Sequence, residues 1–216
     1  MIGVIDSRAS GLVLTVSHHQ KVKRHTMTFK VFPPLILFTS LWLHPSVQAF
    51  NPAHLEQLRQ TGSCVECDLS GVQLPDALLS NTNLRGANLA GANLIRADLR
   101  RANLEYANLS GASLVSANLT EAKLTGANLI VAALIGANLT RANLAGAGLS
   151  LAKLANTNLV GANLSLAELR AADLSNANLT AADLSGADLR EADLDNTILN
   201  NAKLSYAIMP DGTLLP

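Results

Sequence analysis

Leucine recurs at every fifth position along most of this 216-residue chain. The series runs from Leu69 to Leu204 without a gap and contains 28 leucines. Two residues before each leucine the side chain is small, with alanine in 23 cases, and the other three positions are mainly polar. A period this strict has to be explained as a repeat before any local conformational preference is weighed.

Neither a helix nor a flat strand accommodates this period. Five residues turn an α-helix by about 500°, so successive leucines would point in different directions. In a flat strand the side chains alternate between two faces, so leucines five residues apart would fall on opposite sides. The leucines can all point inward only if the chain turns a corner in every repeat. The pattern therefore predicts a closed coil whose inner surface carries leucine and the small residue.

The polar positions carry residues that are typical of turns. Asparagine or aspartate precedes most of the leucines, and such short side chains can hydrogen-bond nearby backbone groups. Nine of the fourteen glycines lie two residues after a leucine. A type II turn requires a positive φ at its third residue, which glycine adopts without strain. These positions are therefore expected to form the corners and the outer surface.

Segments such as ANLSGASL, ADLSGADL and GANLTRANL resemble the pentapeptide-repeat proteins, whose pattern is A-(D/N)-L-x-x. The resemblance covers residues 67–208. It implies an all-β fold, a right-handed quadrilateral parallel β-helix with four repeats per coil and about seven coils. Residues twenty positions apart would then stack. One such column starts at Asp98 and continues through Asn118 to Asn178, and we expect its side chains to hydrogen-bond along the column.

A short helix is predicted before the repeats. Asn51 is a suitable N-cap, Pro52 fits the first helical position, and Gly62 fits the position just past the end. Leu55 and Leu58 fall on one face of this helix, so we expect it to cover the first coil. This divides the chain after its leader into a capping helix and turn (50–63), the repeats (64–208) and a C-terminal tail (209–216).

Residues 1–49 have the composition of an export leader. Residues 31–43 carry no charge, but a helix needs about 20 apolar residues to span a bilayer. The run matches the apolar core of a signal peptide, with Met27 as the true start and cleavage after Ala49. The alternative is an uncleaved membrane anchor. Cleavage predicts an exported protein of the thylakoid lumen or periplasm, without membrane contact after the leader is removed.

Charge and composition argue against several classes of function. Residues 50–216 contain eleven basic and fifteen acidic residues, a net charge of −4, whereas nucleic-acid binders are usually basic. Catalysis needs titratable groups that converge in a pocket, and a core filled with leucine leaves no pocket. We therefore expect no enzyme activity, no small-molecule substrate, no cofactor and no catalytic or metal site. Arg101, Glu121 and Arg141 should form a ladder of alternating charge.

The pair Cys64 and Cys67, in the sequence CVEC, joins the predicted helix to the repeats. This spacing, and the terminal MPDGT, are similar to the entry and ending of exported pentapeptide-repeat proteins of oxygenic photosynthetic bacteria. Four interpretations remain open. The cysteines can form a local disulfide in an oxidising compartment, fill the core as small residues, act as a redox dithiol, or help to bind zinc.

One stretch of the repeats is apolar at its outward positions. In GANLIVAALIGANL, residues 126–139, aliphatic side chains replace the usual polar ones. The positions twenty residues away add further apolar side chains above and below. The predicted patch comprises Ile95, Val115, Ile130, Val131, Ala133, Ile135 and Leu151. Clustered apolar residues often mark a contact surface, although β-branched side chains also simply suit a ladder of strands.

Three functions are compatible with this sequence. The first is an exported rod that binds another protein or a second copy through the apolar patch. The second, implied by the resemblance, is a DNA mimic that binds DNA gyrase. The leader opposes it, and so do Asp183, Asp188 and Asp193, which belong to successive repeats and hence to three different faces. The third is a rod without a specific partner.

Overall fold

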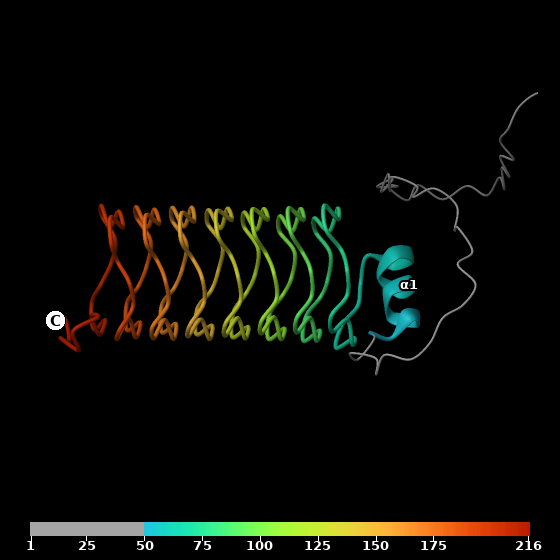
Figure 1. Cartoon of the computed structure of the whole chain (residues 1–216), viewed down its shortest axis with the longest axis horizontal. Coiled ribbons are helices and arrows are strands. Elements are labelled where there is room, and N and C mark those ends of the chain that lie inside the picture. The colour runs from blue at the N-terminus through green and yellow to red at the C-terminus, as the bar shows by residue number, and fades with distance from the viewer. Residues whose placement is uncertain (1–49) are drawn as a thin grey trace, which may run out of the picture. The chain divides into compact units, whose positions relative to one another are not determined.

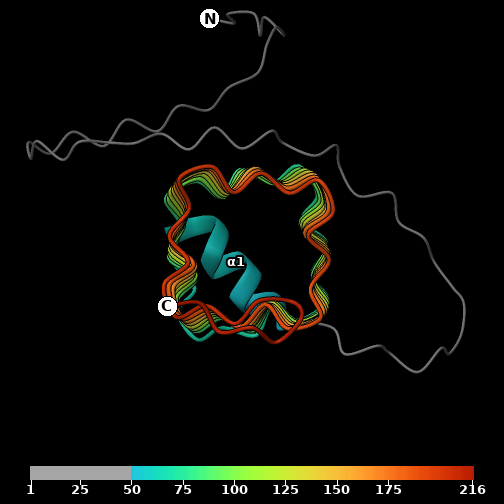
Figure 2. The same ribbon diagram turned by 90° about the vertical axis from the view of Figure 1, so that its left-hand side faces the viewer.

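The computed structural model describes residues 50–216. Within this range the chain forms a helix, α1 (Pro52–Thr61), followed by a square coil that continues to the C-terminal tail (Figures 1 and 2). The predicted leader, with its start at Met27 and cleavage after Ala49, lies outside the described residues. No helix within residues 50–216 is long and apolar enough to cross a bilayer.

The ends of α1 coincide with the signals read from the sequence. The side chain of Asn51 accepts a hydrogen bond from the backbone N–H of Ala53 at 3.0 Å, and Pro52 occupies the first helical turn. Gly62 ends the helix with a φ of 67°, and its N–H donates to the carbonyl of Leu58 at 2.9 Å. These contacts satisfy backbone groups that a helix leaves unpaired at its two ends.

The coil is four-sided because paired residues are twenty apart. Parallel bridges run from Ser63 with Asn83 to Asp188 with Ile208, and each joins residues that directly precede a repeat leucine or its equivalent. Figure 2 shows the resulting square outline. Each side therefore consists of the small residue, the polar residue and the leucine, and the next two residues turn the corner. No longer strands form within residues 50–216, since every side is interrupted after one bridge.

Backbone hydrogen bonds tie each coil to the next. The N–H of Leu104 donates to the carbonyl of Lys123 at 2.7 Å, and at the following corner Tyr106 donates to Thr125 at 3.0 Å. A third bond closes the corner itself, from the N–H of Ala107 to the carbonyl of Leu104 at 3.1 Å. The same three bonds recur along the coil, so its backbone is satisfied by its neighbours rather than by separate sheets.

The core is a ladder of leucine and alanine, as the period predicted. From Leu84 to Leu189 no repeat leucine is more than 1% exposed. Burial of each leucine contributes roughly 1.5–3 kcal/mol of hydrophobic free energy. Toward the C-terminal end the burial weakens, because Leu194, Leu199 and Leu204 are only partly buried.

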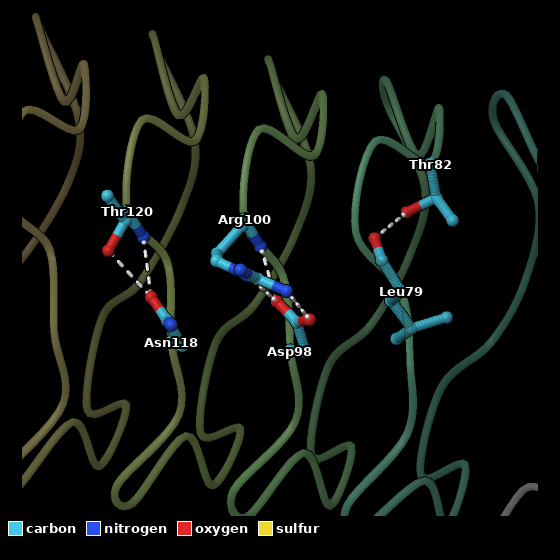
Figure 3. Close-up of polar contacts among 6 residues, drawn as sticks. All are labelled: Leu79, Thr82, Asp98, Arg100, Asn118 and Thr120. Atoms are coloured by element: carbon cyan, nitrogen blue, oxygen red, sulfur yellow. Dashed lines mark hydrogen bonds and ion pairs between the residues drawn. The ribbon is translucent and has the colours of Figure 1, made fainter.

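Threonine replaces the inward alanine at three positions, and each hydroxyl finds a partner. Thr82 donates to the carbonyl of Leu79 at 2.7 Å, as Figure 3 shows, and Thr157 donates to Leu154 at 2.7 Å. Thr197 donates to the carbonyl of Leu174 at 2.8 Å. Because a buried hydroxyl without a partner is costly, these bonds explain why threonine is compatible with the core.

The corners differ from the expectation that glycine supplies their positive φ. Within residues 50–216, twenty residues other than glycine also have a positive φ, Tyr106 at 59° and Leu166 at 58° among them. This conformation costs an L-residue roughly 1–2 kcal/mol, which the recurring backbone bonds and the buried leucine offset. At two corners with glycine, a larger residue would also be crowded by the side chain one coil before it. A Cβ on Gly126 would lie 2.8 Å from the ring of Tyr106, and one on Gly186 would lie 2.8 Å from Leu166.

The expected hydrogen bonds along the column from Asp98 to Asn178 are absent among the described contacts. The Asn118 side-chain oxygen instead accepts hydrogen bonds from the N–H and hydroxyl of Thr120, at 3.1 and 2.7 Å. In the same way the Asp98 carboxylate accepts hydrogen bonds from the backbone N–H and the side chain of Arg100 (Figure 3). The threonine hydroxyl competes for the oxygen that a stacked amide would need. Bonds along a column do occur elsewhere, from Asn88 to Asp68 at 3.2 Å.

Candidate functional site: an exposed apolar patch

The apolar stretch lies on one side of the square and its two corners. Ile130 and Val131 form one corner, Ala133 lies on the side, and Ile135 begins the next corner. Val131 is 51% exposed, and Ile130 and Ile135 are each 38% exposed. A single coil thus presents aliphatic groups across a whole side, where the neighbouring coils carry Ser113 and Lys153 at the middle of the side.

Adjacent coils extend this patch along the rod. Ser116 donates to the carbonyl of Ile135 at 3.0 Å, and Arg96 donates to that of Val115 at 2.9 Å, so Ile95, Val115 and Ile135 follow one another on the same corner. Ile95 and Val115 are only partly exposed.

On the other corner, Leu151 lies one coil beyond Val131 and is 56% exposed. Ala133 pairs with Ser113 on one side and Lys153 on the other. In the structure all seven residues lie in this area, with the highest exposed fractions at Leu151 and Val131.

Sequence reasoning missed a second set of exposed side chains. Tyr106, Leu166 and Tyr206 lie on one corner edge of the coil, and Leu166, at 70% exposed, is among the most open of the large apolar residues. The ring of Tyr106 lies 5.7 Å from the guanidinium carbon of Arg85. The sequence could have indicated this set, because the three residues are separated by multiples of twenty positions. A glycine also lies twenty residues after Tyr106 and twenty residues after Leu166. These side chains are spaced singly, so they make no continuous patch.

Cys64 and Cys67 are joined by a disulfide at the junction of α1 and the first coil. Both side chains are buried, and the N–H of Cys64 donates to the carbonyl of Asn83 at 2.7 Å. Within residues 50–216 no group of three or more histidine, cysteine or acidic side chains is placed to hold a metal ion.

About half of the charged side chains in residues 50–216 form salt bridges with one another. Glu121 lies 2.7 Å from Arg101 and 2.9 Å from Arg141, which confirms the expected ladder. The hydrogen bond from Arg101 lowers the pKa of Glu121, and the hydrogen bond from Arg190 lowers that of Asp188.

The acidic C-terminal half also has basic partners on separate sides. Asp183 lies 3.5 Å from Lys203, and Glu191 lies 3.7 Å from Arg170. The pKa of Asp183 is lowered mainly by hydrogen bonds from Ser185, that of Asp188 by Arg190 and that of Glu121 by Arg101, so these titratable groups have separate local partners and do not converge on one site.

The model of the family of pentapeptide repeats matches this chain in eight copies, over residues 63–101, 92–129, 125–165, 149–186 and 172–211. The chain therefore belongs to the pentapeptide repeat family, whose members fold as right-handed quadrilateral β-helices. The matched residues together run from 63 to 211.

Several solved structures are similar to this chain. HetL, a pentapeptide repeat protein involved in heterocyst differentiation regulation from the cyanobacterium Nostoc sp. strain PCC 7120, is 39% identical, with 70% of this chain and 74% of HetL covered and a TM-score of 0.32.

A pentapeptide repeat protein from the thylakoid lumen of Arabidopsis thaliana is 31% identical, with 53% and 70% covered and a TM-score of 0.25. QnrB1, a plasmid-mediated fluoroquinolone resistance protein, is 21% identical, with 63% and 69% covered and a TM-score of 0.42. No curated protein matches the chain significantly.

Proposed function

We propose that this protein is a non-enzymatic, exported rod that binds another protein, or a second copy of itself, through its apolar patch. The observation that carries the proposal is the run of aliphatic side chains from Ile130 to Ile135, which spans a full side of the square. Polar residues border it along the rod, at Ser113 and Lys153. Such a rimmed apolar area is typical of a protein contact surface.

The rod in this proposal has about seven coils, with α1 as the lid of the first. Leu58 is 3% exposed, and Phe50 and Leu55 pack against the end of the core. The ring of His54 accepts a hydrogen bond through Nδ1 from the N–H of Asp68 at 2.9 Å, which links the helix to the coil. Repeat proteins need such terminal covers because each coil contacts only its neighbours.

A binding role is favoured over catalysis by the way the interior is filled. Leucine and alanine occupy the axis of the coil, and the titratable side chains lie outside it. A general acid or base needs a partner group in a shared site. Pentapeptide repeat proteins are generally structural or interaction proteins, which supports the same class here.

The DNA-mimic alternative finds little support on the surface. A mimic requires a continuous acidic face, whereas Asp183 and Asp188 lie on different sides and have basic partners in Lys203 and Arg190. Export through the leader would also separate the protein from cytoplasmic gyrase. The protein of this proposal works in the thylakoid lumen or periplasm. Cell fractionation tests the compartment, and intact-mass measurement should give a chain that starts at Phe50.

The patch is tested by replacing its two most exposed residues. Val131→Lys with Leu151→Lys should leave the β-type circular dichroism unchanged, because both side chains point into solvent. The double variant should lose self-association in sedimentation, or lose the partner that the parent captures from its own compartment. The matched control is Tyr106→Lys with Leu166→Lys, two side chains that are somewhat more exposed and lie on another edge. If both double variants behave like the parent, the patch is only a ladder of β-branched residues.

A further inference from the structure

The last coil leaves backbone groups unused on three of its four sides. In earlier coils the leucine N–H donates to the next coil, and the carbonyl of the small residue accepts from it. In the last coil, the corresponding groups have no backbone partner within residues 50–216. They are the N–H groups of Leu194, Leu199 and Leu204 and the carbonyls of Ala192, Thr197 and Ala202. Each open side thus presents one donor and one acceptor that flank its outward residue.

The fourth side shows what such an edge can bind. The tail turns back through Gly212, and Leu214 pairs with Ile208 in an antiparallel bridge. Leu215 donates to the carbonyl of Ala207 at 2.9 Å, and Met209 donates to the carbonyl of Thr213 at 2.8 Å. All the other bridges in residues 50–216 are parallel. The donor and acceptor of a coil end are therefore satisfied by a single antiparallel segment of three residues.

The open sides also expose apolar surface. Leu194 and Leu199 are partly exposed, whereas the leucines one coil below are buried. Ile198, which lies between the free carbonyl of Thr197 and the free N–H of Leu199, is 44% exposed. Unpaired backbone groups beside exposed aliphatic side chains are the features by which sheet edges recruit an additional strand.

We propose that the C-terminal end of the rod binds an extended segment of another protein, which adds as an antiparallel strand to the side that contains Ile198. In the pairing shown by the tail, the residue opposite Ile198 belongs to a non-hydrogen-bonded pair, where side chains lie closest. In this proposal the residue of the partner segment opposite Ile198 is aliphatic, and the partner residues before and after it point inward, over Leu199. This docking surface is separate from the apolar patch, so either proposal can fail alone.

The charge around the open sides determines the flanks of the bound segment. Asp193 lies on the side that precedes Ile198, and Asp195 lies on the corner between the two sides. Neither forms a salt bridge with any residue in 50–216. Glu191, two residues before Asp193, adds a third acid and pairs with Arg170. Lysine or arginine at the end of the segment that lies near these acids would complement them, whereas the other flank carries Asn200, Asn201 and Lys203. The partner segment is therefore short, extended, apolar at its centre and basic at one end.

A second copy of this chain fits the same surface poorly. The tail occupies the layer above Ile208 that the fourth side of a stacked second coil would need. Two facing ends would also bring together Asp193 and Asp195 of both copies, and like charges directly opposite are destabilising. A separate extended segment needs only one open side, and it avoids both conflicts.

The test titrates the ¹⁵N-labelled chain with the heptapeptide acetyl-KTLVLTK-amide. We expect the amide resonances of Thr197, Ile198 and Leu199 to shift together, with those of the middle coils unchanged. The same peptide N-methylated at its second leucine lacks the donor for the Thr197 carbonyl and should bind about tenfold more weakly. Equal shifts with both peptides, or none near Leu199 at millimolar concentration, overturn the proposal.

Two variants localise the binding. Ile198→Lys should abolish the shifts, and a peptide with Glu in place of Val should restore them. Asn178→Lys, in the same column one coil below, should bind like the parent. Circular dichroism checks that both variants fold. Shifts at Leu199 that depend on protein concentration without peptide would show self-association and overturn the proposed occupant.

Discussion

At the N-terminal end of the rod, α1 lies over the first coil. At the C-terminal end, a short tail pairs with one side of the last coil (Figures 1 and 2). Leu58 of α1 is buried, while Leu199 in the last coil is partly exposed. A helix satisfies most of its own backbone groups, so it covers a core without offering an edge. A tail in strand form satisfies one side and leaves the others able to pair. The rod thus has one end covered by a helix, here called the closed end, and one end covered only by the tail, here called the open end. In the first coil the backbone N–H and carbonyl groups of Gln73 and Leu78 also lack backbone partners within residues 50–216.

The largest expected effect contrasts the middle of the ladder with its open end. Leu134→Asp places a carboxylate without a partner in the sealed core and should destabilise the protein by about 5 kcal/mol or more. Leu204→Asp lies where water already reaches and should cost about 1–2 kcal/mol. Urea denaturation followed by circular dichroism measures both values. Ser110→Asp on the outside is the control, at under about 0.5 kcal/mol. Equal losses at the two leucines would contradict the difference in burial.

The next effect compares the two covers. Leu58→Ala removes a buried side chain between α1 and the core, and should cost about 2–5 kcal/mol. Leu215→Ala in the tail removes a partly exposed side chain and should cost less than about 1.5 kcal/mol. Thermal unfolding of both variants tests the ranking. A larger loss at Leu215 would mean that the tail, rather than α1, is the more important cover.

Much of the fold follows from the period alone. Leucine at every fifth position, with a small residue two before it, assigns each position from Leu69 to Leu204 to the inside or outside. The ends of α1 are also local, because Asn51 and Gly62 act on the nearest backbone groups. The number of sides came from the family resemblance, since a repeat of five residues is compatible with any closed coil.

Other features depend on contacts that a period does not contain. The positive φ of Tyr106 and Leu166 is imposed by the corner, against their own preference. The terminal sequence MPDGT contains a turn, but its residues do not say which edge Leu214 will join or in which direction. Within the patch, the twenty-residue period is enough to align Ile95 with Val115, whereas their degree of exposure depends on the neighbouring coils.

The third prediction concerns the disulfide at the closed end. Cys64→Ala with Cys67→Ala opens a loop of only a few residues, so the chain-entropy model predicts a loss of about 2 kcal/mol. Alanine fits the inward position of Cys67, as it does in most repeats, so packing should change little there. Hydrogen exchange should show faster opening of α1 and unchanged protection in the last coils. Equal protection of α1 in the parent, the reduced parent and the variant would contradict a role for the disulfide at this end.

The smallest effect is a loss of stability in acid, which should differ between the two ends. At the closed end, hydrogen bonds from Ser70 lower the pKa of Asp68, and at the other end the hydrogen bond from Arg190 lowers the pKa of Asp188. A carboxyl group whose pKa is lowered by folding stabilises the folded state above its unfolded pKa, near 3.9, and this contribution is lost as the pH falls through the folded pKa. Unfolding midpoints should therefore be constant near neutral pH and should decrease below about pH 4.

The variant Asp188→Asn tests this prediction. It should lose less stability in acid than the parent, and the remaining loss should be the part that Asp68 contributes. Because Asp68 is exposed and the side chain of Arg190, the partner of Asp188, is partly exposed, salt should weaken the effect further. Amide exchange at pH 3 and pH 6 separates the ends, since the variant should change the protection of the last two coils and leave α1 as in the parent.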